Sequence, residues 1–140
     1  MKRFVLLILA LVCFQVAHGK QGVSVTKGHQ IIGTWKFDIP GIGCAETYRF
    51  FANGTTLVTS GEEIAESVYE ISSQPSLLGF YKIVDTITKD NGGRDCMGEA
   101  TAPGHRATNY IQFNATGNSM IMCQSENMDN CFGPIKKIPE

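Results

Sequence analysis

The chain has 140 residues, which fits a single domain, and 43% of them are hydrophobic. Its formal net charge is −1, and its basic residues are too scattered to neutralise the phosphates of a nucleic acid. No basic amphipathic helix suggests binding to a membrane surface.

The N-terminal residues have the pattern of an export signal. Lys2 and Arg3 precede an apolar run over residues 4–14, and residues 17–19 (Ala-His-Gly) place small side chains at a cleavage site. The run is too short to span a bilayer as a helix. A lipoprotein anchored through Cys13 is the alternative, but the residues before Cys13 lack the small side chain that such a signal uses. We expect a periplasmic or secreted protein.

Three segments follow from this pattern: a signal peptide at 1–19, a flexible polar lead at 20–28 and a single domain at 29–140. Cleavage removes two of the twelve basic residues, which leaves ten basic side chains against thirteen acidic ones. An acidic mature chain again argues against nucleic acid as a partner.

Strand-like alternation recurs along the domain, roughly every eight to twelve residues, whereas helical periodicity does not. The first run lies in 29–38, and Asn53-Gly54 between 46–51 and 56–60 is a strong hairpin signal. Further runs are predicted at 66–72, 79–88, 94–101, 108–113, 119–123 and 131–138, with turns at 90–93, 102–105 and 114–118. A short helical turn is considered only for 61–66.

The sequence therefore predicts an all-β fold, an antiparallel up-and-down meander of about eight strands. An open meander leaves two sheet edges exposed, and closure removes them. We expect the meander to close into a small barrel, whose interior either is filled by side chains or holds one small ligand.

The mature chain contains four cysteines. An even number in a short exported domain indicates two disulfides, for which three pairings are possible. We favour Cys123–Cys131 as a clip over 124–130, a segment with little to pack by itself, and Cys44–Cys96 as a long-range tie. A structural zinc site is the weaker alternative, because such sites prefer closely spaced cysteines.

The single tryptophan, Trp35, follows Gly33 and Thr34 at the start of the first predicted strand. This Gly-x-Trp opening, followed by hairpins, resembles the lipocalin and fatty-acid-binding (calycin) superfamily. The resemblance implies a lipocalin-like barrel in which the indole packs across the closed end. It also implies a basic side chain over the indole, here Lys136 or Lys137. A core aromatic of any β fold is the alternative role for Trp35.

A second resemblance covers the whole mature chain. Residues 44–50 (Cys-x-Glu-x-Tyr-x-Phe), 95–96 (Asp-Cys) and 131–134 (Cys-Phe-Gly-Pro) are similar to segments of small exported proteobacterial proteins of unknown role. This resemblance implies no activity.

Ten side chains are predicted to point inward from alternate strand positions, and they are the candidate ligand-binding residues: Tyr48, Phe50, Tyr69, Ile71, Tyr81, Ile83, Ile111, Phe113, Met120 and Met122. Asp85 shares the face of Tyr81 and Ile83, and Ser67 shares that of Tyr69. The ten either line an apolar cavity or fill the interior. A cavity above about 300 Å³ would favour a small-molecule ligand.

Residues that usually carry catalysis are sparse. His29 and His105 are the histidines of the mature chain, and neither lies near a nucleophile in an elbow-like sequence. We expect both to be solvated. The densest acidic group is expected to be a solvated face rather than a catalytic pair; it comprises Glu62, Glu63, Glu66 and Glu70. No enzymatic activity, cofactor or metal site is predicted.

Two binding functions fit these observations. The first is an exported, non-enzymatic, lipocalin-like protein that holds an apolar or amphipathic small molecule. The second is an exported protein–protein interaction module, such as an inhibitor, immunity or adhesion factor, with a filled barrel. Its candidate contact loops are 60–66 and 124–130, because a disulfide-held acidic loop is preorganised and so loses less entropy on binding.

Overall fold

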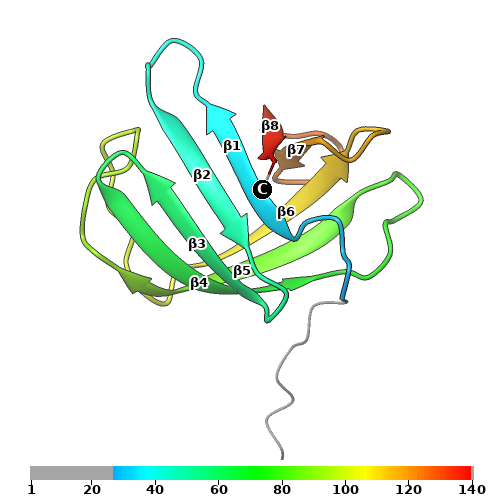
Figure 1. The fold of residues 1–140 in the computed structure, drawn as a ribbon, viewed down its shortest axis with the longest axis horizontal. Helices are drawn as coiled ribbons and strands as arrows, with labels where there is room; N and C mark the ends of the chain where they lie inside the picture. The colour runs from blue at the N-terminus through cyan, green and yellow to red at the C-terminus, as the bar shows by residue number, and fades with distance from the viewer. Residues whose placement is uncertain (1–26, 140) are drawn as a thin grey trace, which may run out of the picture.

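A computed structural model describes residues 27–139; the predicted signal peptide and most of the predicted lead lie outside the described residues. The chain forms antiparallel strands that follow one another around a closed barrel (Figure 1). The strands are β1 (Gly33–Asp38), β2 (Ala45–Phe50), β3 (Thr55–Ser60), β4 (Glu63–Ile71), β5 (Tyr81–Asp90), β6 (Arg106–Phe113), β7 (Ser119–Cys123) and β8 (Phe132–Ile138). The predicted all-β meander and its closure are confirmed.

Closure is made by the first and last strands. Thr34 of β1 lies opposite Ile138 of β8, and Lys36 lies opposite Lys136. Every strand therefore has a partner on each side, and no sheet edge is left free among the described strands. Within residues 27–139, no helix is long and apolar enough to cross a membrane.

Two local predictions are wrong. Residues 94–101 belong to a connection without a strand, because the carboxylate of Asp95 accepts hydrogen bonds from the backbone N–H groups of Met97 and Glu99 at 2.9 and 2.8 Å and turns the chain. The helical turn considered for 61–66 is replaced by the start of β4 at Glu63, where burial alternates from residue to residue.

The connections alternate between the two ends of the barrel, since each strand runs opposite to the one before it. Segments 51–54, 72–80 and 114–118 lie at one end, which we call the floor. Segments 39–44, 61–62, 91–105 and 124–131 lie at the other end, and we call these four segments the rim.

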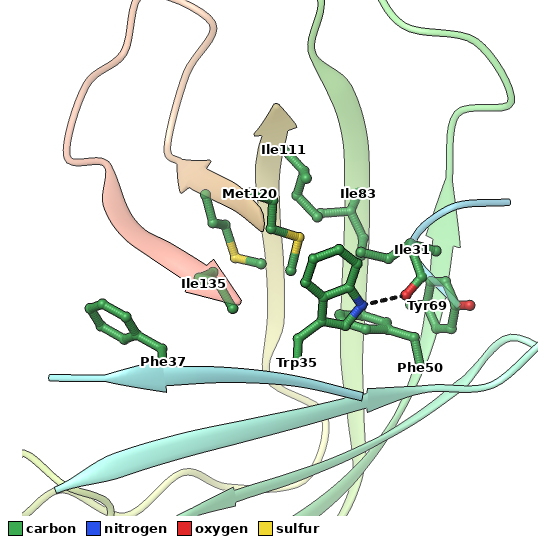
Figure 2. Close-up of a cluster of buried hydrophobic side chains, with 10 residues drawn as sticks. Ile31, Trp35, Phe37, Phe50, Tyr69, Ile83, Ile111, Met120 and Ile135 are labelled. Atoms are coloured by element: carbon green, nitrogen blue, oxygen red, sulfur yellow. Dashed lines mark hydrogen bonds between the residues drawn. The ribbon is translucent and has the colours of Figure 1, made fainter. Parts of the chain in front are cut away.

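Trp35 is fully buried at the floor. Its indole N–H donates a hydrogen bond of 2.7 Å to the carbonyl oxygen of Ile31 (Figure 2), and its ring lies 5.6 Å from that of Phe113. The residues before β1 lie across this end, because Ile31 is buried in the core and the ring of His29 contacts Tyr81 edge-on at 5.0 Å.

The basic side chain over the indole is Lys137, whose Nζ lies 5.2 Å from the centroid of the Trp35 ring. Lys136, the other residue considered for this place, is exposed. Gly33 has a φ of +125°, and a Cβ there would lie 2.9 Å from Cε of Lys137. The glycine of the Gly-x-Trp opening thus leaves room for the lysine.

Both favoured disulfides are confirmed. Cys44–Cys96 joins two rim segments that are 52 residues apart in sequence, and Cys123–Cys131 closes the rim segment between β7 and β8. The two cross-links lie at the same end of the barrel, opposite Trp35.

Candidate functional site

Most of the barrel interior is filled by side chains (Figure 2). Six of the ten candidate ligand-binding residues belong to the buried core: Phe50, Tyr69, Ile83, Ile111, Met120 and Met122. The other four are half-buried, and Tyr48, Ile71 and Phe113 pack against the core. Tyr81 lies edge-on to Phe113 at 5.6 Å. The structure places all ten on the interior side of their strands.

A cavity of about 110 Å³ lies inside the barrel and is partly open to solvent. We call it the calyx cavity; its lining residues are Tyr48, Phe50, Thr56, Val58, Ile83, Asp85, Ala107, Asn109 and Met122. Only four of the ten candidate residues line it. Its volume is well below the roughly 300 Å³ at which sites for drug-sized ligands begin. Larger hollows of about 340 and 470 Å³ lie on the outer surface, over Val68 and Val84 and beside Ile138.

Asp85 is the carboxyl group of the calyx cavity. Its Oδ1 accepts a hydrogen bond of 2.6 Å from the hydroxyl of Ser67, which is itself buried. Burial raises the pKa of Asp85, and the Ser67 hydrogen bond and the nearby His105 lower it by less. Among residues 27–139 the ion pairs are Lys36–Asp38 and Lys89–Glu66, so no such pair neutralises Asp85.

A hydrogen-bond network connects the cavity to the rim. Glu46 accepts hydrogen bonds from the hydroxyls of Tyr48 and Ser60, the latter at 2.8 Å. Ser60 in turn accepts from the backbone N–H of Cys96 at 3.0 Å. Burial, and then the charge of Glu46, holds the pKa of Tyr48 well above its ordinary value, so the phenol remains a donor. The network fixes the polar wall next to the Cys44–Cys96 disulfide.

A second acidic group lies where the rim covers the start of β4. Glu63 is only 7% exposed, and its Oε1 and the Oδ2 of Asp90 are buried without a hydrogen-bond partner among the described residues. Burial, and then the neighbouring Asp90, raises the pKa of Glu63, while a hydrogen bond with Thr101 lowers it. Segment 91–105 packs tightly here, since a Cβ on Gly93 would lie 2.2 Å from the carbonyl oxygen of Glu62.

The predicted solvated face is therefore only partly correct. Glu62, Glu66 and Glu70 are exposed, but Glu63 is buried. Of the two candidate contact loops, 124–130 is mostly exposed, whereas 60–66 includes the buried residues Ser60, Glu63 and Ala65. His105 is exposed, but His29 is half-buried against Tyr81, and burial lowers the pKa of His29.

The rim segment between β7 and β8 is held by its own side chains as well as by its disulfide. The hydroxyl of Ser125 donates to Asp129 at 2.6 Å, and the amide of Asn130 donates to Gln124 at 2.8 Å. Met128 projects from this segment with 58% of its surface exposed. Ile42 and Met97, on the two segments joined by the other disulfide, are exposed by 46% and 65%.

Charge is distributed unequally between the two ends. The rim carries one basic side chain, Arg94, and five acidic ones: Glu62, Asp95, Glu99, Glu126 and Asp129. Arg94 donates to the carbonyl oxygen of Gly98 at 2.6 Å, within its own segment. Among the described residues, the floor segments 51–54, 72–80 and 114–118 carry no charged side chain. The largest exposed apolar side chains there are Leu77 and Leu78.

The polar residues of the interior were not selected from the sequence. Asp85 and Ser67 were placed on inward faces by alternation, but only their apolar neighbours became site candidates. The same alternation places Glu46 on the face of Tyr48 and Thr56 on that of Ser60. These interior residues could have been found as polar side chains at the same alternate positions as the inward apolar ones.

Comparisons of the chain with models of protein families, with curated proteins and with solved structures found no match. In the described part of the chain, no three His, Cys, Asp or Glu side chains gather closely enough to hold a metal ion.

Proposed function

We propose that this protein is an exported, non-enzymatic binding protein whose rim binds a partner protein with a basic surface. The observation that carries this proposal is the acidic, disulfide-held rim on a barrel whose interior is largely filled. The small calyx cavity weighs against the alternative, a carrier of an apolar molecule of drug size.

Charge complementarity supports a basic partner. Five acidic side chains against one basic side chain gather on the rim, while the floor segments carry none. Such an asymmetric field orients an approaching basic protein and accelerates encounter. Asp90, at a strand end next to the rim, adds to the field; Arg106 opposes it, and Asp38 is paired with Lys36.

The rigidity of the rim and its exposed apolar side chains also support the rim as the binding surface. Two disulfides and the Ser125–Asp129 and Asn130–Gln124 hydrogen bonds order the rim before any partner arrives, which lowers the entropy lost on binding. The exposed side chains of Ile42, Met97 and Met128 would supply the apolar contacts that acidic groups alone do not.

The proposal includes an extracytoplasmic location and membership of the lipocalin-like (calycin) barrels. The two disulfides support an oxidising compartment. The closed barrel with Trp35 beneath Lys137 at one end supports the calycin assignment.

Site-specific photocrosslinking in the native host tests the proposal. A photoreactive residue replaces Met97 on the rim in one variant and Leu77 at the floor in another. We expect a discrete heteromeric adduct from position 97 and at least ten-fold less from position 77. Combining the Met97 probe with Glu62→Lys, Glu99→Lys and Glu126→Lys should abolish the adduct by reversing the charge of the rim.

The matched control places three lysines near the floor instead, by Glu70→Lys, Ser73→Lys and Gln74→Lys, and should leave the adduct unchanged. Equal adducts from positions 97 and 77, or no heteromeric adduct at all, would contradict the proposal. Native mass spectrometry of the exported protein adds an independent check. A bound molecule of several hundred daltons, lost on denaturation, would favour the small-molecule carrier instead.

A further inference from the structure

The calyx cavity combines features that a purely structural interior does not need. Thr56 is 3% exposed and lines the cavity, and its hydroxyl has no hydrogen-bond partner among the described residues. A buried hydroxyl without a partner destabilises a fold. Asp85 faces the same cavity without a cationic neighbour within ion-pair distance in the described chain. The cavity therefore offers one hydroxyl without a hydrogen-bond partner and one carboxyl group without an ion-pair partner.

Polar and apolar side chains lie next to each other in the rest of the lining. Asn109 adds an amide oxygen and lies opposite Ile83, and its strand neighbour Ala107 lies opposite Asp85. Thr56 lies opposite Phe50, and Met122 adds a further apolar side chain. A ligand that uses both kinds of group carries hydrogen-bond donors and positive charge together with a short hydrocarbon segment.

The size of the cavity limits the ligand further. A volume of about 110 Å³ corresponds to about four water molecules in the liquid, at about 30 Å³ each. Such a space accepts a ligand of about five non-hydrogen atoms and excludes fatty acids, retinoids and other long apolar molecules.

We propose that the calyx cavity is a binding site for a short primary alkylammonium ion. The ammonium group donates hydrogen bonds to the carboxylate of Asp85, the hydroxyl of Thr56 and the amide oxygen of Asn109. The alkyl chain packs on Phe50 and Met122. This site is distinct from the rim surface, so its occupancy does not depend on whether the rim binds a protein.

Titration with n-butylammonium chloride, compared with 1-butanol at matched ionic strength, tests the proposal. The two probes have the same number of non-hydrogen atoms and differ in charge. Chemical-shift changes of the backbone amides of Asn109 and Met122 report binding. We expect n-butylammonium to bind at least ten-fold more tightly than 1-butanol.

Two variants test whether the preference for n-butylammonium over 1-butanol arises in the calyx cavity. Asp85→Asn keeps an oxygen that can accept the Ser67 hydrogen bond and removes the charge, so the ten-fold preference should disappear. Glu70→Gln removes one charge from the outer face of β4 and should leave the preference intact; Glu70 lies beside Tyr69, the register partner of Asp85. Equal losses in both variants would show a general attraction to an acidic protein and overturn the proposal.

A third variant, Thr56→Val, is expected to change stability and ligand affinity in opposite directions. Removing the unpartnered hydroxyl should raise the melting temperature, while the affinity for n-butylammonium should fall several-fold. Stabilisation without any loss of affinity overturns the role of Thr56. Non-saturating shifts with n-butylammonium, or equal affinity for 1-butanol, overturn the site.

Discussion

The two ends of the barrel satisfy different physical requirements. At the floor, Trp35 is fully buried and its one polar atom donates to Ile31. The ring of Phe113 lies beside it, and Lys137 lies over the indole. Toward the rim, the interior contains Asp85 and Glu63, whose pKa values are raised by burial. The unpartnered hydroxyl of Thr56 lies nearer the floor, because Thr56 is the second residue of β3 and lies opposite Phe50. The floor stabilises the fold, and the polar end lowers its stability.

The positions of the two disulfides also differ between the two ends of the barrel. Both disulfides lie at the rim, and the floor has none among the described residues. Polar groups retained in a small interior at a cost in stability often mark functional positions. The rim and the calyx cavity are therefore the positions at which we expect function, and the floor is the position at which we expect stability.

The largest expected effect is at the floor. Trp35→Ala removes the largest buried side chain and the hydrogen bond to Ile31, and should lower the free energy of unfolding by about 3–5 kcal/mol. Tyr48→Phe, at the polar end, removes only the hydroxyl that donates to Glu46 and should cost about 1 kcal/mol. Urea denaturation of both variants measures the two values. Similar losses would contradict the division of the barrel into two regions.

The stability lost on removing each disulfide should increase with the length of the loop that the disulfide closes. The double variant Cys44→Ser/Cys96→Ser frees a long loop and should cost about 4 kcal/mol on the chain-entropy model. Cys123→Ser/Cys131→Ser frees a short one and should cost about 2.5 kcal/mol. Denaturant unfolding of both variants, with the oxidised parent protein as reference, measures the two losses. A larger loss from the short loop would show that the packing of 124–130, rather than chain entropy, dominates.

A matched pair of enlargements compares filled and unfilled interior. Met120→Phe adds volume next to the floor, where Met120 is only 2% exposed, and should cost about 1–3 kcal/mol through overpacking. Ala107→Val adds two methyl groups to the wall of the calyx cavity and should be neutral or stabilise by up to about 1 kcal/mol. Thermal melts of the two variants measure both changes in stability. Destabilisation by Ala107→Val would show that the cavity cannot accept added volume.

Alternation along the strands was sufficient to predict the barrel and the direction of its inward side chains. Tyr69 and Ile83 are each in phase with inward neighbours, and the same phase assigns Asp85 to the interior. The burial of Glu63 follows the same phase through Ala65 and Ser67, but the strand predicted at 66–72 begins too late to include it. The choice of Lys137 over Lys136 depends on the register of β8, and that register shifts against β7 between Met120 and Met122.

The smallest expected effect is the pH dependence of Asp85. Its pKa is raised above the ordinary value of 3.8, so the folded protein holds this proton more tightly than the unfolded chain does. The stability that this tighter proton binding contributes is fully present below the unfolded pKa, and it is lost as the pH rises through the folded pKa. Above the folded pKa the carboxylate is charged in both states, and its desolvation lowers stability.

Asp85→Asn should therefore raise the melting temperature at pH 7, and the gain should shrink toward pH 4. The groups facing Asp85 are Ser67 from β4, Tyr48 from β2, Asn109 from β6 and the nearby His105, whose charge lowers the pKa of Asp85. Melts of Asp85→Asn in a His105→Gln background separate the two groups. A gain that stays constant from pH 4 to 8 would assign the effect to the hydrogen bond with Ser67, and the polar end would then owe its lower stability to Glu63 instead.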